Sequence, residues 1–163
     1  MDPVRIKRIL PDVTFPKYSS AEASGLDLYA GETKVMAPGE HCTVRSGIAM
    51  QIPKGFVGLI WDKSGRAASG IKTMGGVIDS DYRGEIQFIL KNVNDTPFTI
   101  EKNTKLAQMI FHRVEQHIIE EANDLNDTAR GEGKFGSTGL KWKNQRTIRI
   151  LLKSRKPTVT TFL

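Results

Sequence analysis

Residues 76–85, GVIDSDYRGE, place two carboxylates, a phenol and a guanidinium between glycines. Apolar residues precede this group and recur at every second position after it, so the segment predicts a strand, a tight bend and a second strand. A bend that only reverses the chain needs no more than Asn-Gly or Asp-Gly. The acid Asp79, the ring of Tyr82 and the cation of Arg83 instead suit a site for a charged ligand that carries a ring. A polar hairpin tip accounts for the same residues equally well.

Outward from this segment, short runs of β-type residues alternate with turn-forming clusters. The runs cover residues 4–10, 43–52, 56–61, 86–90 and 106–111, and the clusters include APGE (37–40), IPKG (52–55), NDTP (94–97) and EKNT (101–104). This spacing is typical of an all-β sandwich or barrel. Only SGRAAS (64–69) resembles a helix, so we expect a mostly β body with one short helix.

The composition is that of a single soluble domain. The chain has 163 residues, 39% of them hydrophobic and 26% charged, which is enough to bury a core. Its first residues show no apolar run fit for a signal peptide, and no stretch is long enough to span a membrane. The single cysteine, Cys42, has no partner for an internal disulfide, which fits a reducing compartment. We therefore expect a cytoplasmic or otherwise intracellular protein.

The formal charge of +6 comes from the end of the chain. Residues 141–163 hold seven basic residues and no acid, so residues 1–140 carry a net charge of −1. The body therefore has no excess of cations of the kind that binds a phosphate backbone. We expect a β-barrel core over 1–120, a flexible arm over 121–139 and a basic tail over 140–163. The tail is either a solvated, disordered extension or a contact for nucleic acid or another acidic partner.

The arm contains RGEGKFGSTG (130–139), which matches G-x-G-x-x-G. No strand precedes it, and too few residues follow it for a dinucleotide-binding unit. Its glycines let backbone N–H groups converge on an anion, while Arg130, Ser137 and Thr138 add donors. Phe135 offers a face on which a base can stack. The motif favours a phosphate-and-base site over a plain flexible linker.

Three more segments carry polar residues beside apolar strands. In WDKSGRA (61–67), Lys63, Ser64 and Gly65 form either an anion site or an ordinary helix start with Ser64 as N-cap. Asp27 lies within an apolar run, where a buried carboxylate is costly unless it is paired or bound to a metal. Gln108 interrupts an otherwise apolar strand and at its simplest faces solvent.

The chain offers no site for a zinc ion. His41, His112 and His117 have no metal-ligand spacing, and there is one cysteine. A hard cation held by carboxylate oxygens and nucleotide phosphates is the metal that fits, which predicts Mg²⁺.

Taken in order, the segments around Asp27, Ser64, Asp79, Gln108 and 130–139 resemble the five motifs of the trimeric dUTP pyrophosphatases. The resemblance implies a distorted β-jelly-roll or β-clip barrel that assembles as a homotrimer, with three active sites at subunit junctions. The fifth motif would close each site as a lid from another subunit. The implied reaction is the Mg²⁺-dependent hydrolysis of dUTP to dUMP and pyrophosphate.

By matching position, the resemblance makes Asp79 the general base that activates water for attack on the α-phosphate. Tyr82 would pack against the deoxyribose and exclude a 2′-hydroxyl, and the backbone from Tyr82 to Ile89 would read the uracil. Asp27 would orient Mg²⁺ through its water shell. The implied substrate-binding residues are Lys63, Ser64, Gly65, Gly76, Val77, Asp79, Tyr82, Gln108, Arg130, Phe135, Gly136, Ser137 and Thr138.

In the lid, the resemblance assigns Arg130, Ser137 and Thr138 to the γ-phosphate and Phe135 to the face of the uracil. This chain has Lys134 where the family usually has glycine, and it continues for 24 residues past the motif.

The second motif usually reads Pro-Arg-Ser-Gly, whereas this chain has Asp62 and Lys63 in the first two places. Lysine keeps the charge but lacks the forked geometry of arginine. A dCTP deaminase, which shares the fold, is disfavoured because its family places a catalytic glutamate where this chain has Ile89. A non-catalytic nucleotide-binding or regulatory protein of the same fold is the other alternative.

Overall fold

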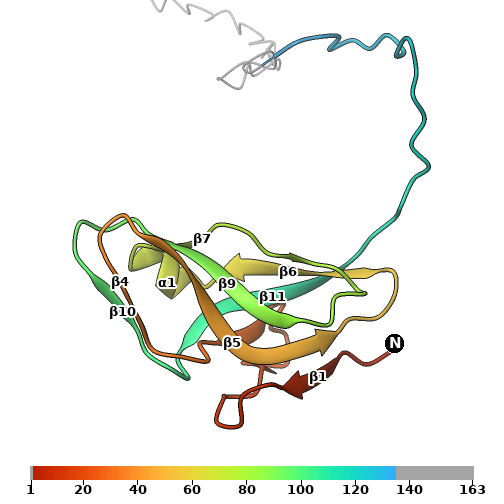
Figure 1. Ribbon diagram of the computed structural model, residues 1–163. Coiled ribbons are helices and arrows are strands. Elements are labelled where there is room, and N and C mark those ends of the chain that lie inside the picture. Colours follow the sequence, from red (N-terminus) through yellow and green to blue (C-terminus); the bar gives the residue numbers. More distant parts are fainter. Residues whose placement is uncertain (1, 135–163) are drawn as a thin grey trace, which may run out of the picture. The chain divides into compact units, whose positions relative to one another are not determined.

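The computed structural model describes residues 2–134, and these form β-strands with one short helix (Figure 1). The helix is α1 (Ser64–Ala68). The strands are β1 (Arg5–Arg8), β2 (Lys17–Tyr18), β3 (Leu26–Tyr29), β4 (Lys34–Met36), β5 (His41–Gln51), β6 (Phe56–Asp62), β7 (Ile71–Thr73), β8 (Val77–Ile78), β9 (Glu85–Asn92), β10 (Phe98–Ile100) and β11 (Lys105–Arg113). The expected all-β fold with one short helix is confirmed.

The strands form two antiparallel sheets and a two-stranded ribbon. One sheet has the order β1-β5-β9-β7 and the other the order β2-β3-β11-β6-β8, while β4 pairs with β10. In Figure 1 the long strands β5 and β9 cross in front of β6 and β11. The sequence of β9 explains its place, because buried and exposed residues alternate from Ile86 to Leu90, as in a strand with one face on a core.

The core lies between the two sheets. Ile48 and Phe88 enter it from the first sheet, and Leu28 and Met109 enter it from the second, each with 2% or less of its surface exposed. Full burial of one such side chain contributes about 2 kcal/mol. The packed sheets form the rigid part of the jelly roll, and the residues at the strand ends take their positions from it.

Each run of residues expected to be a strand contains one, with ends that differ by no more than two residues. The sequence pattern does not reveal β2, β3, β4, β7 or β10, which have two to four residues each. Strands of this length are too short to show a period of two. Only their pairing with longer neighbours identifies them.

The expected hairpin at residues 76–90 is wrong in one respect. β8 does not pair with β9: it pairs with β6 in the five-stranded sheet, whereas β9 pairs with β5 and β7 in the four-stranded sheet. Residues 79–84 therefore cross from one sheet to the other. A local pattern of strand, bend and strand cannot distinguish a hairpin from a crossing, because both have the same alternation.

The chain divides into two units at residue 118, and the structure describes residues 2–118 of the first and 119–134 of the second. In the second unit, the described residues 119–134 are exposed and make local turns, such as the hydrogen bond of 3.0 Å from the Gly131 amide to the Thr128 carbonyl. The boundaries expected at residues 120 and 139 stay predictions. Among residues 2–134, no helix has the length and apolar character that a membrane crossing requires.

Candidate active site

Asp27 lies in β3 and is only 1% exposed. Nζ of Lys63 lies 2.6 Å from its Oδ1, and Nζ of Lys105 lies 2.7 Å from its Oδ2. The Ser19 hydroxyl also donates to Oδ2. Both carboxylate oxygens thus have donors, so the charge that would be costly to bury alone is paired.

These contacts determine the ionisation of Asp27. Burial by itself raises the pKa of a carboxyl group, but hydrogen bonds from Lys105, Lys63 and Ser19 outweigh it and hold the pKa of Asp27 well below its usual value. The same hydrogen bond raises the pKa of Lys105. The group formed by Ser19, Asp27, Lys63 and Lys105, called the Asp27 cluster below, combines one carboxylate with two ammonium groups and has a formal charge of +1.

Gln108 lies beside this cluster. In the strand register it is opposite Asp27 on one side and Trp61 on the other. Its side chain is half-buried, and its Nε2 donates to the carbonyl of Asp62 at 2.9 Å. The simplest expectation for Gln108, a side chain that merely faces solvent, is wrong, because its amide fixes the end of β6.

The start of α1 differs from an ordinary N-cap. The N-cap residue is Lys63, which makes no side-chain capping hydrogen bond, and Ser64 is the first residue of the helix. The alternative of Ser64 as an N-cap is therefore wrong. Ser64 and Gly65 are both exposed, so their hydroxyl and amide groups are accessible to a ligand.

Residues 79–84, called the Asp79 crossing below, hold the second group of candidate residues. Gly76 leads into it with a φ of 152°, and its carbonyl accepts the Ile60 amide at 2.8 Å. A Cβ at Gly76 would lie 2.6 Å from the Cβ of Ile60. This close approach requires glycine and holds the exposed Val77 against β6, just before the exposed Asp79.

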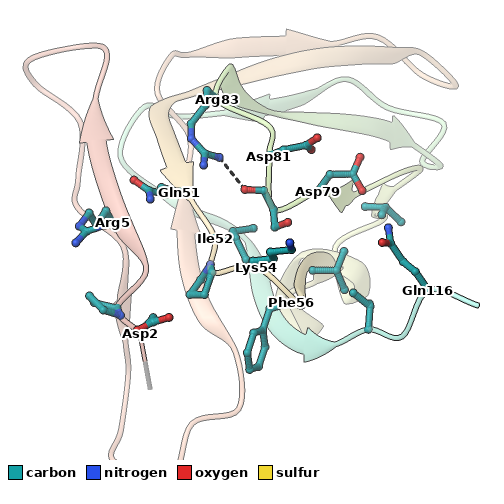
Figure 2. A pocket seen from close by; sticks show the side chains of 17 residues that line it. Asp2, Arg5, Gln51, Ile52, Lys54, Phe56, Asp79, Asp81, Arg83 and Gln116 are labelled. Atoms are coloured by element: carbon teal, nitrogen blue, oxygen red, sulfur yellow. Dashed lines mark hydrogen bonds between the residues drawn. The ribbon is translucent and has the colours of Figure 1, made fainter.

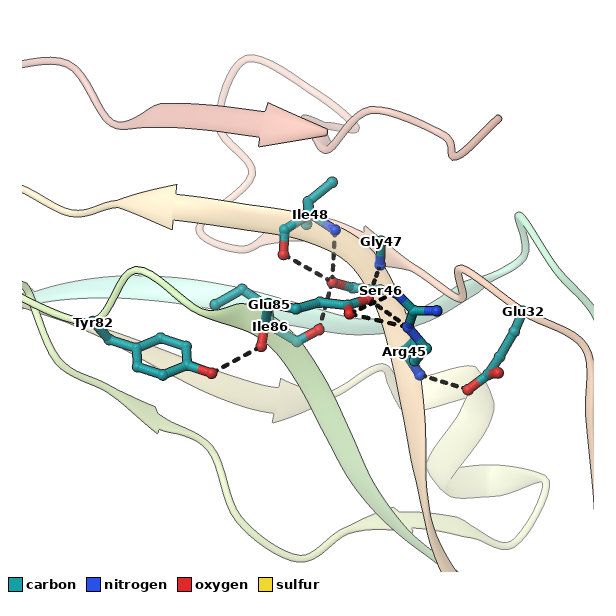
Figure 3. Close-up of polar contacts among 8 residues, drawn as sticks. All are labelled: Glu32, Arg45, Ser46, Gly47, Ile48, Tyr82, Glu85 and Ile86. Carbon is teal, nitrogen blue, oxygen red and sulfur yellow. Dashed lines mark hydrogen bonds and ion pairs between the residues drawn. The ribbon is translucent and has the colours of Figure 1, made fainter. Parts of the chain in front are cut away.

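The ring of Tyr82 is held by its own turn. Its hydroxyl donates to the Glu85 carbonyl at 3.0 Å (Figure 3). A Cβ at Gly84 would overlap that hydroxyl and the ring, so glycine is needed there too. The ring is nevertheless 43% exposed, so one of its faces remains free to pack against a ligand.

The base of the crossing is tied to a bulge in β5. Nε of Arg45 lies 3.0 Å from one carboxylate oxygen of Glu85, and the Gly47 amide donates to the other at 2.8 Å (Figure 3). The register between β5 and β9 shifts between Arg45 and Ala49, as expected for a bulge. Glu85 therefore fixes the point from which the Tyr82 turn departs.

Asp79 borders an open cavity of about 960 Å³ (Figure 2). Besides this turn, the cavity is bordered by the loop between β5 and β6, the start of the chain and residues 114 and 116. Its charged side chains balance, with three anions and three cations: Asp2, Asp79, Asp81, Arg5, Lys54 and Arg83. Arg83 is itself bonded to the Ser80 carbonyl at 2.7 Å, which stabilises the turn rather than the cavity.

The Asp27 cluster and the Asp79 crossing do not meet within one copy of the chain. β3 and β8 lie three strand spacings apart in their sheet, which is about 14 Å. The two groups also lie at different positions along β6. Asp27 is level with Trp61, whereas the residue before Asp79, Ile78, pairs with Gly58. The predicted residues therefore fall into two separate groups on unit 1–118.

Arg130 belongs to the other unit, where it is exposed and its Nε donates to the Gly133 carbonyl at 3.3 Å. The remaining predicted residues of the fifth motif, Phe135, Gly136, Ser137 and Thr138, lie outside the described residues.

Sequence reasoning did not anticipate Ser19, Lys105 or Glu85. Lys105 lies three residues before Gln108 on the same strand, and this nearness was the only available signal. Ser19 and Glu85 carried none, because their roles depend on pairings between distant strands.

The described residues suit a metal that arrives with its ligand. Among residues 2–134, no group of three or more His, Cys, Asp or Glu side chains is placed to hold a metal ion. The single carboxylate of Asp27 suits the coordination preference of Mg²⁺, which keeps several waters and is bound through one or two carboxylates together with substrate phosphates.

The comparisons with known proteins agree on one family. The dUTPase family model matches residues 12–139. Deoxyuridine 5′-triphosphate nucleotidohydrolase of Thermobifida fusca is 41% identical over 140 residues, which cover 83% of this chain and 78% of that protein. The protein of the same name from Anaplasma marginale is 43% identical over 129 residues, covering 76% of this chain and 88% of that protein.

Among solved structures, a dUTPase variant of Staphylococcus bacteriophage 80alpha with bound dUpNHpp has a TM-score of 0.80 at 22% identity, covering 86% of this chain and 100% of that one. A dUTPase variant from phage phi11 of S. aureus, described with a structural Mg(II) ion, has a TM-score of 0.72 at 19% identity, covering 77% of this chain and 100% of that one. These likenesses concern the fold. With the family match over most of its length, the chain belongs to the dUTPase family.

Proposed function

We propose that this protein hydrolyses dUTP to dUMP and pyrophosphate, with Asp79 as the general base. The observation that carries this proposal is the exposed carboxylate of Asp79 at the rim of an open cavity, next to a tyrosine ring held in place by its own turn. The names of the relatives from Thermobifida fusca and Anaplasma marginale support the substrate.

In the proposed reaction, Asp79 accepts a proton from a water molecule. The water oxygen then attacks the α-phosphorus, and the bond from that phosphorus to the bridging oxygen of the β-phosphate breaks. Pyrophosphate leaves with the electron pair. A carboxylate within hydrogen-bond reach of the water is the simplest base for this step.

Tyr82 acts in this proposal as a steric filter. Its hydroxyl is bonded to the Glu85 carbonyl, so the ring cannot easily move away. A ring packed against C2′ of the sugar leaves no room for a 2′-hydroxyl and discriminates without a new polar contact. The backbone from Tyr82 to Ile89 is proposed to hold the uracil and the sugar, together with Gly76 and Val77, which precede the crossing.

The Asp27 cluster is proposed to take the phosphates. Lys63 supplies a positive charge, the exposed Ser64 and Gly65 supply hydroxyl and amide donors, and Gln108 supplies an amide. Cations and fixed donors stabilise a transferring phosphoryl group electrostatically. The assignment of Arg130, Phe135, Gly136, Ser137 and Thr138 to a lid stays a prediction.

Asp27 is the residue proposed to face Mg²⁺, through water. When bound, Mg²⁺ neutralises charge on the triphosphate and polarises its oxygens. Before the ligand arrives, Lys63 and Lys105 neutralise the carboxylate in its place. Asp27 thus remains ionised, and its oxygens would accept hydrogen bonds from the water shell of the metal.

A complete site needs a second copy of the chain. The Asp27 cluster and the Asp79 crossing are too far apart for one triphosphate, so we propose that one copy supplies Asp79 and another supplies the phosphate-binding residues, in a homotrimer. An apolar face runs between the two groups, since Leu59, Trp61, Val77 and Ile110 share one side of the sheet by register. Trp61 is 54% and Val77 68% exposed, as expected of surface that another copy covers.

A nucleotide panel tests the proposed reaction. Pyrophosphate release is expected from dUTP in the presence of Mg²⁺ and much more slowly from UTP, dCTP and dTTP. Equal rates with UTP would contradict the role of Tyr82. Ammonia release from dCTP would instead favour the deaminase alternative. The exposed Ile89 argues against deamination, because its side chain has no proton to transfer.

Mixed oligomers test the division of the site between copies. Chains with Asp79→Asn and chains with Asp27→Asn, differently tagged and co-expressed, are each expected to be nearly inactive alone. Their mixed oligomers, purified through both tags, should recover about a third of the wild-type rate, because in a mixed trimer one junction of the three combines an intact Asp79 from one copy with an intact Asp27 from another. The control co-expresses two differently tagged Asp79→Asn chains. Mixed oligomers as inactive as this control would show that each site lies within one chain.

A further inference from the structure

Asp62, the last residue of β6, connects the two sheets. One oxygen of its carboxylate accepts both the Thr73 amide at 2.7 Å and the Thr73 hydroxyl at 2.6 Å. The other oxygen forms an ion pair with Lys72. Thr73 and Lys72 belong to β7, at the edge of the other sheet. The side chain therefore closes the base of the loop 63–72, which contains α1.

The same residue has a second attachment through its backbone. Its carbonyl accepts Nε2 of Gln108 at 2.9 Å, so Asp62 joins β6, β7 and β11 at one point. The next residue, Lys63, places its ammonium on Asp27. Two of the proposed phosphate-binding residues are thus attached directly to Asp62, Gln108 by this hydrogen bond and Lys63 by a peptide bond.

The hydrogen bonds to the Asp62 carboxylate are charge-assisted and therefore strong. The carboxylate is 15% exposed. Burial raises the pKa of Asp62, but the hydrogen bonds from Lys72 and Thr73 outweigh this effect, so the pKa is lowered. Donors to an ionised carboxylate form shorter and stronger bonds than donors to a neutral acceptor. Because the site stays charged near neutral pH, the loop base is held closed in the free protein.

We propose that Asp62 is a positioning residue for the triphosphate: by fixing the base of the loop 63–72, it sets Lys63, Ser64 and Gly65 for contact with the phosphates. This inference rests on the proposed function and deepens it. Asp62 itself does not touch the ligand. It acts through the backbone of the loop, and a small displacement of phosphate-binding groups is enough to weaken a well-oriented contact.

A purely structural bond between the sheets predicts something different. Its loss would lower stability and weaken every ligand alike. Positioning of the phosphate-binding loop instead predicts a loss confined to ligands that carry phosphates, because the uracil and the sugar are assigned to the Asp79 crossing on another part of the sheet. The ligand series therefore separates the two roles.

The test compares Asp62→Ala and Asp62→Asn with a matched control, Lys91→Met. Lys91 lies directly opposite Lys72 in the β7–β9 pair, and its ammonium is bonded to the Gly39 carbonyl, away from Asp62. The ligands are a non-hydrolysable dUTP analogue with Mg²⁺ and 2′-deoxyuridine, which has no phosphate. Calorimetry or NMR titration measures both affinities in the full-length oligomer.

For Asp62→Ala the analogue is expected to bind about tenfold more weakly, as for the loss of hydrogen bonds to a charged group, while deoxyuridine binding changes less than about twofold. Asp62→Asn keeps an acceptor for Thr73, so its loss should be smaller. Lys91→Met should match the wild type for both ligands. Unchanged analogue affinity in Asp62→Ala, or an equal loss for deoxyuridine, would overturn the inference.

If Asp62→Ala fails to fold, Thr73→Val replaces it, because this change removes only the hydroxyl bond and keeps the amide bond. The same phosphate-selective loss is expected from it, at about threefold, and equal losses for both ligands would contradict the inference. The proposed function is judged separately on the wild type. A wild-type protein that neither hydrolyses dUTP nor binds the analogue would refute that function whatever the Asp62 variants do.

Discussion

Asp27 lies within the five-stranded sheet and Asp79 directly follows its edge strand β8, yet the surroundings of the two carboxylates are opposite. Asp27 is almost completely buried and bonded to two ammonium groups and a hydroxyl. Asp79 is exposed at the rim of an open cavity. The first acid has its counter-charges supplied by its own chain, whereas the second is left accessible.

The difference teaches how one chain separates structural and chemical demands. A buried charge must be paired or it destabilises the fold, so Asp27 contributes to stability whether or not a ligand is bound. A general base must reach water, so Asp79 gains nothing from internal partners. We therefore expect substitutions at Asp27 to affect both the fold and the reaction, and those at Asp79 to affect only the reaction.

The largest expected effect is on catalysis at Asp79. Asp79→Asn should lower kcat about 10³-fold, because the amide cannot accept the proton from water. Binding of the non-hydrolysable analogue should change little. Steady-state kinetics measures the first quantity and calorimetry the second. Asp81→Asn, at an exposed acid lining the same cavity, is the control and should stay within about threefold of wild type; full activity in Asp79→Asn would remove Asp79 from the role of base.

The next effect concerns stability at Asp27. Asp27→Asn should lower the free energy of unfolding by about 2 kcal/mol, because Lys63 and Lys105 lose their partner. The loss is limited because both lysine side chains are partly exposed and regain water. Urea unfolding at a fixed protein concentration measures it. Asp79→Asn should stay within about 0.5 kcal/mol of wild type, and equal stability losses at both positions would erase the contrast between the two acids.

A smaller effect is expected on sugar discrimination. Gly84→Ala places a Cβ against the Tyr82 ring and should displace it, which reduces the preference for dUTP over UTP about tenfold. The ratio of kcat/KM for the two nucleotides measures this. Gly75→Ala, in the preceding connection between β7 and β8, is the control, since its Cβ would meet only Ile89 at an ordinary 3.6 Å. A preference that Gly84→Ala leaves intact would place the discrimination elsewhere.

The smallest effect is a pH dependence of stability. The pKa values of Asp27 and Asp62 are lowered in the folded protein, so the unfolded chain binds more protons than the folded one below about pH 4. Their contribution is fully present above that pH and is lost as the pH falls toward the lowered values. Between pH 5 and pH 3 the wild type should lose about 1 kcal/mol more than a double variant with Asp27→Asn and Asp62→Asn.

Urea unfolding across that pH range measures the difference, and Asp79→Asn should follow the wild type. Parallel curves for the wild type and the double variant would mean that Asp27 and Asp62 do not control the loss of stability at acid pH.

Much of the body could be predicted from local patterns. The alternation from Ile86 to Leu90 identified a strand with one buried face, and SGRAAS (64–69) identified the helix. The candidate residues themselves were also visible, since an acid within an apolar run and a polar residue interrupting a strand stand out in a sequence. Their partners were not visible. Ser19 and Glu85 carry no local signal, and Lys105 has only its nearness to Gln108, because each acts on a residue of another strand.

The sequence by itself determined which segments form the longer strands and which residues are candidates for the site, because residue type and a period of two are local properties. Only the tertiary structure decided that β8 joins β6 instead of β9, that Asp27 is paired with lysines, and that Asp27 and Asp79 lie apart. The reason is physical. Strand register and charge pairing depend on which distant segments bury their apolar faces together, and no window of the sequence contains both partners.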